Sequence, residues 1–220
     1  MSPPNKLLES DAATSGRWRR GSLLALTVVG VAGSVAGRAA QQPIRWADSP
    51  VSEPLVLETS RLRLVPIATA DAEEWWGTIW SDLDVARYLP PQGILPVEAV
   101  RERIRIAMEH WVTHGFGIWM LRETRSGSLV GHCGLLANES SDPELVYALC
   151  RQVWGRGLAT EAAAAVLAYA FDTHNLAQVS AYVFPRNTAS SRVLRKLDFH
   201  AEGQVRRFQA HLDHFVLRHE

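Results

Sequence analysis

The sequence predicts an α+β domain in which helices flank a mixed β-sheet, preceded by an N-terminal extension that is not globular. From residue 55 onward, segments with the alternation of strands and segments with helical spacing follow in the order β-α-α-β-β-β-α-β-α-β-β. Hydrophobic residues make up 47% of the 220, which is typical of a chain with a packed core. Basic and acidic side chains balance at 23 each, which argues against a protein built mainly to hold nucleic acid.

The first 54 residues differ from the rest in charge and in pattern. Residues 1–50 carry six basic and three acidic side chains, a net charge of +3, so the remaining chain carries −3. Residues 17–40 combine a basic start, an uncharged apolar stretch at 21–37 and small residues, which is the shape of a secretory signal or a membrane anchor. Residues 41–54, with three prolines, are typical of a linker. The alternatives are an unstructured extension, a misassigned start, or membrane association through 21–37.

The first half of the domain is predicted from periodicity and turn residues. Alternation over 55–66 predicts a half-buried strand, and a helix follows to Trp80 with Asp71 as its capping residue. Pro96 suits the start of a second helix, which keeps helical spacing to Thr113. An antiparallel meander is then predicted, with strands over 116–122, 129–137 and 144–150 and a turn over 125–128.

The second half contains a glycine-bearing loop that links a strand to a helix. The loop spans 152–157, and the remaining elements are a helix over 158–172, a strand over 178–184, a helix over 187–197 and closing strands from 199 to 218. The first N–H groups of a helix have no intrahelical partner and its dipole favours anions, so this loop predicts a phosphate cradle. Its two glycines allow φ > 0, and Arg151 and Arg156 add positive charge. Neither a P-loop nor a dinucleotide fingerprint is present.

Gln152-Val153-Trp154-Gly155-Arg156-Gly157 resembles the Gln/Arg-x-x-Gly-x-Gly/Ala acyl-CoA motif of the GNAT family of N-acetyltransferases. The longer run 154–162 is similar to the branch that contains the ribosomal-protein alanine acetyltransferases (RimJ/RimL-like). Segments 60–64, 187–199 and 214–217 also resemble that branch, in the same order. The resemblance covers about Leu55 to Glu220 and implies a GNAT acetyltransferase domain there.

The resemblance implies a splayed sheet that holds acetyl-CoA as co-substrate, without a metal. Pantetheine would lie between the strand at 144–150 and the strand at 178–184. Backbone groups of 149–153 would pair with it, N–H groups of 153–159 would hold the pyrophosphate, and Asn187 would contact it from the other side. The implied cofactor-binding residues are Leu149, Cys150, Arg151, Gln152, Val153, Trp154, Gly155, Arg156, Gly157, Leu158, Ala159 and Asn187.

The implied chemistry is attack of an amine on a thioester, which requires a group that removes a proton from the amine. Glu144, at the start of the strand before the loop, is the candidate base; its alternative role is a solvated carboxylate at a strand edge. Ser190 matches a serine of the family and would sit near the thioester sulfur. The alternatives are that Ser190 is an ordinary helix residue, or that Ser191 occupies this position in its place. Asp198 stands where the family usually has glycine, and it is expected at φ > 0.

Two classes of function remain open from the sequence. The first is an N-acetyltransferase acting on a primary amine, either a protein N-terminus or a small molecule; the acidic domain favours a cationic acceptor. The second is a non-catalytic module that binds acyl-CoA. Trp75, Trp76 and Trp80 are expected in the helix core or in an acceptor pocket, and a metal at His110 and His114 is not expected. Because acetyl-CoA is a cytosolic reagent, the domain is expected in the cytoplasm, with a membrane-anchored form as the alternative.

Overall fold

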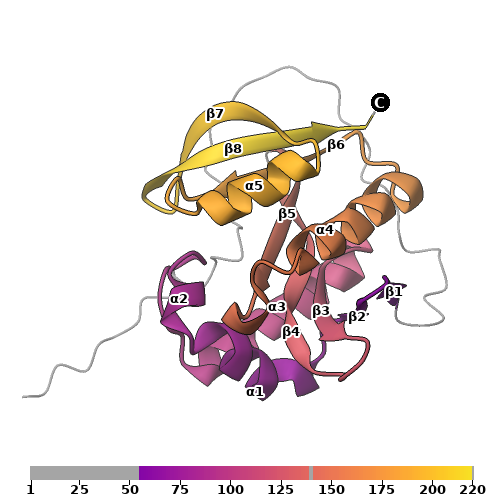
Figure 1. Ribbon diagram of the computed structural model, residues 1–220, viewed down its shortest axis with the longest axis vertical. Helices are drawn as coiled ribbons and strands as arrows, with labels where there is room; N and C mark the ends of the chain where they lie inside the picture. Colours follow the sequence, from indigo (N-terminus) through magenta and orange to yellow (C-terminus); the bar gives the residue numbers. More distant parts are fainter. Residues whose placement is uncertain (1–54, 139–140, 220) are drawn as a thin grey trace, which may run out of the picture.

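The computed structural model describes residues 55–138 and 141–219, so the extension with its signal, anchor or linker lies outside the described residues. The described chain forms an eight-stranded sheet in the order β1-β2-β3-β4-β5-β6-β8-β7, flanked by helices (Figure 1). The strands are β1 Leu57–Glu58, β2 Leu62–Pro66, β3 Ile118–Glu123, β4 Leu129–Asn138, β5 Ser141–Leu149, β6 Gln178–Val183, β7 His200–Arg207 and β8 Ala210–Arg218. The α-helices are α1 Ala72–Trp75, α2 Leu83–Ala86, α3 Val97–His114, α4 Leu158–Ala168 and α5 Thr188–Lys196.

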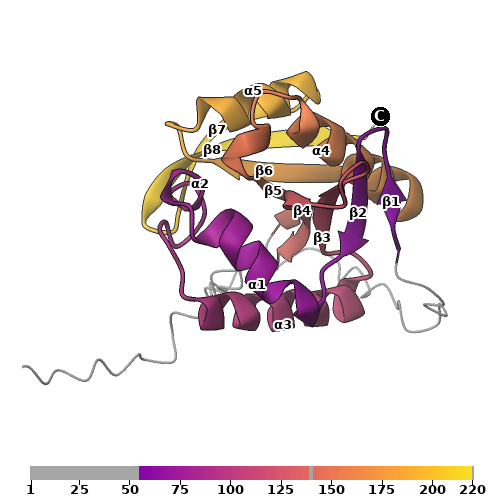
Figure 2. The ribbon, with the colours of Figure 1, turned by 60° about the horizontal axis from the view of Figure 1, so that its bottom comes forward.

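Alternation along the strands divides the core into two layers. On β3, Trp119 and Leu121 pack on one face of the sheet with residues of α4, whereas Ile118 and Met120 pack on the other face with residues of α1 and α3. Figure 2 shows α1 and α3 on one side of the strands and α4 and α5 on the opposite side. Because both faces are covered, β3 is buried along almost its whole length.

Two predictions for the first half of the domain are wrong in detail. The expected strand over 55–66 breaks at residues 59–61 into β1 and β2, which pair antiparallel with Leu57 opposite Leu64. A tight turn causes the break, because the Thr59 N–H donates to the Leu62 carbonyl and the Leu62 N–H donates to the Thr59 hydroxyl. Asp71 does not cap the following helix: its carboxylate accepts from the Ala68 N–H at 2.8 Å and pairs with Arg122 at 3.1 Å.

The helices after residue 80 show what periodicity can and cannot predict. α3 begins directly after Pro96 and ends at Gly115, whose φ of 73° is the left-handed cap of the helix. The four-residue α2 was not predicted, because a single turn leaves no periodicity to detect; the Asp82 carboxylate caps it by accepting from the Asp84 N–H. Asp198 lies at φ 61° after α5, which confirms the expectation from the sequence.

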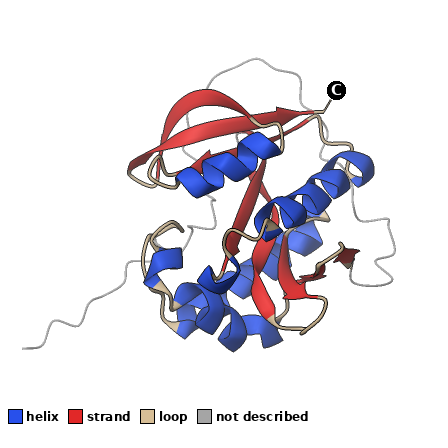
Figure 3. Ribbon diagram, in the orientation of Figure 1, coloured by secondary structure: helices blue, strands red, loops and turns tan. Residues whose placement is uncertain are grey.

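The sheet is mixed and splayed, as predicted. Strands β1 to β5 pair antiparallel in sequence order, but β5 and β6 are parallel and share only the Glu144–Ser180 pair. On its other edge, β6 pairs antiparallel with β8 along its whole length. In Figure 3 the strands of the two halves run in clearly different directions on either side of this junction. The sheet therefore opens between the carboxyl ends of β5 and β6.

Gly134, at the centre of β4, tests the packing of the sheet. A Cβ there would lie 2.2 Å from the Gly117 carbonyl oxygen and 2.8 Å from the Ile118 Cα, both backbone atoms. We expect Gly134→Ala to lower the free energy of unfolding by about 1–3 kcal/mol, measured by denaturant unfolding. Gly77→Ala is the matched control, since a Cβ at that helical position meets nothing within 4 Å and should leave stability equal or higher. Equal stability of the Gly134 variant and the wild type would contradict this packing.

Candidate active site

The opening between β5 and β6 leads into a cavity of about 620 Å³. Its walls come from β5, β6, the start of α4, one side of α5 along its whole length, the segment after α2 and the turn between β7 and β8. β5 keeps β4 as its neighbour over most of its length, whereas no described strand pairs with its other edge after Glu144. The backbone of 145–149 therefore presents an open strand edge to the cavity, which is the arrangement expected for pairing with an extended ligand.

The glycine loop forms one end of the cavity. Gly155 and Gly157 adopt φ of 75° and 77°, which confirms the expected left-handed conformations. α4 begins at Leu158, and its first intrahelical bond runs from the Glu161 N–H to the Gly157 carbonyl, so the preceding N–H groups lack a partner within the helix. A Cβ on Gly155 would meet no protein atom within 4 Å. Space, free N–H groups and the helix dipole all fit a phosphate.

Eight of the twelve predicted cofactor-binding residues line this cavity: Leu149, Val153, Trp154, Gly155, Gly157, Leu158, Ala159 and Asn187. Cys150, Gln152 and Arg156 face a smaller hollow on the other side of the loop, and Arg151 lines neither. The two arginines that were expected to add positive charge to the loop each form an ion pair. Arg151 pairs with Asp84 at 2.5 Å, and Arg156 pairs with Glu123 at 2.7 Å. Both arginines thus tie the loop to neighbouring elements through their side chains.

Trp154 connects the loop to the end of β5. Its indole N–H donates to the Leu149 carbonyl at 2.7 Å, while 47% of the residue remains exposed at the cavity. This contact already uses one acceptor position of the Leu149 carbonyl, which was expected to pair with pantetheine. Sequence reasoning included Trp154 for its backbone and missed this role of its side chain.

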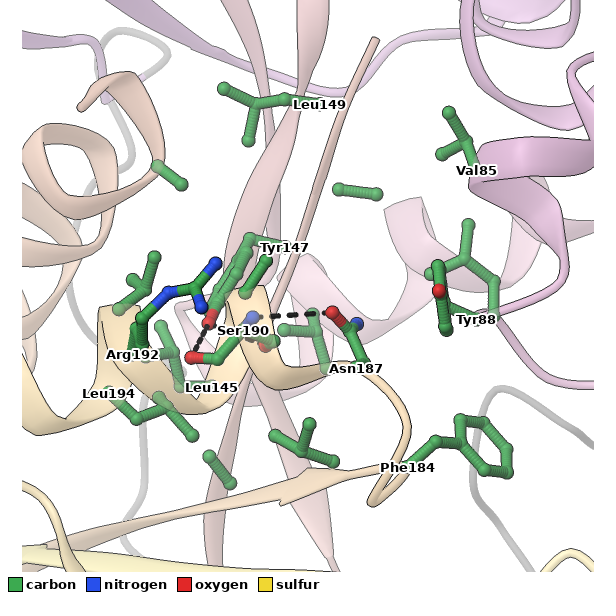
Figure 4. A pocket seen from close by; sticks show the side chains of 18 of the residues that line it. Val85, Tyr88, Leu145, Tyr147, Leu149, Phe184, Asn187, Ser190, Arg192 and Leu194 are labelled. Atoms are coloured by element: carbon green, nitrogen blue, oxygen red, sulfur yellow. Dashed lines mark hydrogen bonds between the residues drawn. The ribbon is translucent and has the colours of Figure 1, made fainter. Parts of the chain in front are cut away.

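A pair of hydroxyl groups lies in the middle of the cavity, where α5 faces β5 (Figure 4). The Ser190 and Tyr147 hydroxyls are 2.7 Å apart, and the Tyr147 hydroxyl also lies 3.2 Å from the Ser190 carbonyl. Burial raises the pKa of Tyr147, so its proton stays in place at neutral pH. Asn187 caps α5 by accepting from the Ser190 N–H at 3.2 Å, which sets the position of Ser190. Ser191, the alternative to Ser190, is buried and does not line the cavity.

Glu144 lies at the end of the cavity away from the glycine loop. It is 8% exposed, so it is not the solvated edge carboxylate considered as its alternative. Its Oε2 accepts from Arg207 Nη1 at 3.0 Å. Burial raises the pKa of Glu144, and the Arg207 charge and hydrogen bond oppose that shift only in part. The guanidinium of Arg207 is itself held over the Tyr182 ring, 4.1 Å from its centroid.

Aromatic residues surround this end of the cavity, which we call the acceptor end. Phe208 in the β7–β8 turn follows Arg207, the partner of Glu144, and Tyr88 after α2 and Phe184 after β6 line the same cavity. Figure 4 shows Tyr88 and Phe184 on the side of the cavity opposite Tyr147. The three tryptophans considered from the sequence lie elsewhere: Trp75 and Trp80 are buried in the core between α1, α3 and the sheet, and Trp76 packs against that core.

Glu161, in the first turn of α4, holds the glycine loop to the β1–β2 turn. Its Oε1 accepts from the Thr59 hydroxyl at 2.6 Å and the Arg61 N–H at 2.9 Å, and its Oε2 from Arg61 Nε at 2.6 Å. Arg61 also donates to the Arg156 carbonyl within the loop at 2.8 Å. Burial raises the pKa of Glu161, but these bonds outweigh it and the net pKa is lowered. Sequence reasoning missed this contact, because its partners are about a hundred residues apart.

Among the described residues, no cluster of three or more histidine, cysteine or acidic side chains could hold a metal. Both ring nitrogens of His110 form hydrogen bonds within the protein. Nδ1 is hydrogen-bonded to the Phe116 carbonyl oxygen at 2.8 Å, and Nε2 accepts from the Ala137 N–H at 2.8 Å. Both cysteines are buried and unbridged. No helix in the described ranges is long and apolar enough to span a membrane.

Fold and cavity define the class of the protein: an acyl-CoA-dependent N-acetyltransferase. The family model described as an acetyltransferase (GNAT) domain matches residues 61–200, so the chain belongs to the GNAT family.

Three known proteins illustrate the similarity. An N-acetyltransferase of Bacillus licheniformis named p20, whose function is uncharacterised, is 29% identical over 155 residues, covering 70% of this chain and 86% of that protein. The structure of a GnaT-family acetyltransferase from Bordetella pertussis matches with a TM-score of 0.65 and 24% identity, covering 74% of this chain and 98% of the other. RimL, a ribosomal-protein α-N-acetyltransferase solved in complex with coenzyme A, matches with a TM-score of 0.66 and 14% identity over 74% and 98% of the two chains.

Gly155→Val tests the placement of the cofactor at the loop. The change puts a β-branched side chain where the pyrophosphate is expected, so we expect acetyl-CoA affinity to fall at least tenfold, about 1.4 kcal/mol, by calorimetry. Gly127→Val in the β3–β4 turn is the matched control: its φ of 71° resembles the 75° of Gly155, and both positions are open. Both variants should lose about 1–2 kcal/mol of stability, but only the first should lose affinity. Retained affinity in Gly155→Val would contradict the placement.

Glu161→Gln tests the contact that holds the loop. We expect a loss of about 2 kcal/mol of stability at pH 7, since charged hydrogen bonds are replaced by neutral ones. Because the folded-state pKa is lowered, the carboxylate stabilises the fold above its ordinary value near 4.5, and this contribution disappears as the pH falls through the folded value. The difference between variant and wild type should therefore shrink below pH 4.5 in denaturant unfolding. Glu98→Gln, in the first turn of α3, is the control and should show no such difference.

Proposed function

We propose that this chain transfers the acetyl group of acetyl-CoA to a primary amine by direct attack within a ternary complex. One observation carries the proposal: a single cavity joins the glycine loop at one end to the buried carboxylate of Glu144 at the other. Acetyl-CoA supplies the activated acyl thioester. Membership of the GNAT family supports the acetyl transfer itself.

The residues that would hold acetyl-CoA lie along one path. N–H groups at the start of α4 and the open backbone of Gly155 suit the pyrophosphate, and the free edge of β5 suits the extended pantetheine. Arg192 and Lys196 of α5 also line the cavity, and both are positively charged. The reactive end of the ligand would then lie beside Ser190 and Tyr147.

The proposed role of Glu144 is to accept the proton of the attacking amine. An ammonium group is not a nucleophile, so a base within reach is needed. Oε2 of Glu144 is bound to Arg207, and no hydrogen bond to Oε1 is formed by the described residues. Oε1 is therefore the oxygen that we assign to the proton, directly or through one water. Its raised pKa makes Glu144 a stronger base than an exposed carboxylate.

The proposed role of the Ser190–Tyr147 pair is to protonate the sulfur that leaves. Cleavage of the carbon–sulfur bond puts negative charge on the thiolate. A hydroxyl donor at that position stabilises this charge, and the 2.7 Å contact allows Tyr147 to pass its proton to Ser190 as Ser190 protonates the sulfur; solvent then takes the proton from Glu144 and returns one to Tyr147. Ser190 is the group we place next to the sulfur, with Tyr147 as its support.

The acceptor is either a protein N-terminus, as in the RimJ/RimL-like branch, or a small-molecule amine. The likeness to RimL supports the fold and leaves both acceptors open. We place the reaction in the cytoplasm, where acetyl-CoA is available. The competing function, a non-catalytic module that binds acyl-CoA, is tested directly. Acetyl-CoA should stabilise the enzyme thermally and a panel of amines should release free thiol; stabilisation without turnover on any amine would support the module instead.

Substitutions at Glu144 and Arg207 test the proton acceptor. We expect Glu144→Gln to lower kcat about 10²–10⁴-fold and to remove the loss of rate at low pH. Arg207→Gln removes the charge that opposes the raised pKa of Glu144, so the acid limb of the pH–rate profile should move to higher pH. Arg206→Gln, at the exposed neighbouring position, should leave the profile in place. An acid limb that persists in Glu144→Gln would exclude Glu144 as the base.

A further inference from the structure

We propose that the acceptor carries an anionic group, a carboxylate or a phosphate, near its reactive amine, and that Arg186 binds this group. The inference rests on the proposed function, since it requires the acceptor to enter the same cavity. Arg186 lies in the loop between β6 and α5, directly before Asn187, and lines the cavity. No residue assignment from the sequence included it.

Contacts on two sides hold Arg186 in place. Its Nη2 donates across the cavity to the Arg87 carbonyl at 3.1 Å and to Gln92 Oε1 at 3.2 Å. Its guanidinium lies 5.9 Å from the centroid of the Tyr88 ring and 5.6 Å from that of Phe184. Such contacts orient the guanidinium before a ligand arrives, which lowers the entropy lost on binding.

Part of the guanidinium remains available for a ligand. The contacts above use Nη2, whereas Nε and Nη1 donate no hydrogen bond to the described residues. These nitrogens carry three N–H groups, and a planar fork of this kind matches the oxygens of a carboxylate or a phosphate. The exposed side chain keeps these groups within reach of an entering molecule.

The acidic residues that line the cavity or lie close to Arg186 all have other partners, so Arg186 has no acidic partner in the described chain. Glu144, the acidic residue lining the cavity, is paired with Arg207 at 3.0 Å. Asp84 of α2 is paired with Arg151 at 2.5 Å and with Arg87 at 3.5 Å. The local balance is therefore positive and favours an anion, although the domain as a whole is acidic. Dissolved ions screen electrostatic interactions beyond about 8 Å at physiological salt. Charges close to Arg186 therefore affect a bound ligand more than the net charge of the domain does.

The charge that the acceptor should carry therefore follows from the groups around Arg186 and not from the net charge of the domain. The net negative charge of the domain suggested a cationic acceptor, whereas the surroundings of Arg186 favour an acceptor that bears an anionic group.

Matched acceptor pairs test the inference on the full-length protein. The pairs are alanine and alaninamide, 2-aminoethyl phosphate and ethanolamine, and amidated dipeptides that begin with aspartate or with asparagine. Thiol release should show kcat/KM at least about tenfold higher for the anionic member of at least one pair, the size expected for a charge-assisted hydrogen bond. Which pair responds identifies a free carboxylate, a phosphate or an acidic N-terminus as the anionic group.

Variants separate binding of the anion from other roles of Arg186. Arg186→Gln should lower kcat/KM for the anionic member to about the level of the neutral one and leave the neutral member and acetyl-CoA affinity unchanged. Arg186→Lys should retain part of the preference, and Arg125→Gln, in the exposed β3–β4 turn, should retain all of it. Equal losses on both members, or weaker acetyl-CoA binding, would show a structural or cofactor role and overturn the inference.

A binding measurement distinguishes failure of this inference from failure of the proposed function. Protein saturated with coenzyme A, which cannot transfer an acetyl group, is titrated with each acceptor by calorimetry. Tighter binding of anionic members, lost in Arg186→Gln, would support the inference whether or not turnover occurs. Wild-type protein that acetylates amines without preference for charge would overturn the inference alone. Acetyl-CoA binding without turnover on any amine would overturn the proposed function.

Discussion

The separation of β5 from β6 is the constraint on which the rest of this structure depends. Two parallel strands that share one residue pair, Glu144 with Ser180, leave the edge of β5 open over the following residues. An unpaired strand edge inside a domain must bind something or face solvent. Here it faces a cavity that the glycine loop and Glu144 both line, the two features on which the proposed acetyl transfer depends. Residues of both halves share one hydrophobic core with α4 and α5, and this core joins the halves beside the gap.

The glycine loop shows how a binding site is stabilised from a distance. The loop has to adopt two left-handed conformations and leave the N–H groups of residues 155–157 without partners among the described residues, and both features cost stability. Glu161 and Arg61 offset this cost from outside the cavity, through charged hydrogen bonds that join the loop to the β1–β2 turn. The arginines of the loop itself contribute in the same way, by pairing with Asp84 and Glu123. The backbone groups that would bind a phosphate and the charged side chains that hold the loop in place thus face different partners.

The two ends of the cavity differ in how their charges are arranged. At the loop, backbone N–H groups and a helix dipole offer diffuse positive charge to a phosphate. At the acceptor end, Arg207 neutralises Glu144 in part, and Arg186 is held between aromatic rings with N–H groups to spare. The acceptor end therefore combines a base with a cation, which suits an amine that also bears an anion.

Local patterns in the sequence determined most of the helices and strands, and the glycine-loop end of the cavity. Alternation, helical spacing and turn residues predicted the meander, α3, α4 and α5, since these signals depend on neighbouring residues alone. The left-handed glycines of the loop followed from the same local chemistry, whereas the positive φ of Asp198 was implied by the resemblance to the GNAT family. Tertiary structure decided the rest. Residues about a hundred positions apart meet at Glu161, Ser190 finds its partner in Tyr147 across two elements, and Arg186 bridges to a segment near residue 90. No spacing along the chain specifies such contacts, because they exist only once the sheet has formed and opened.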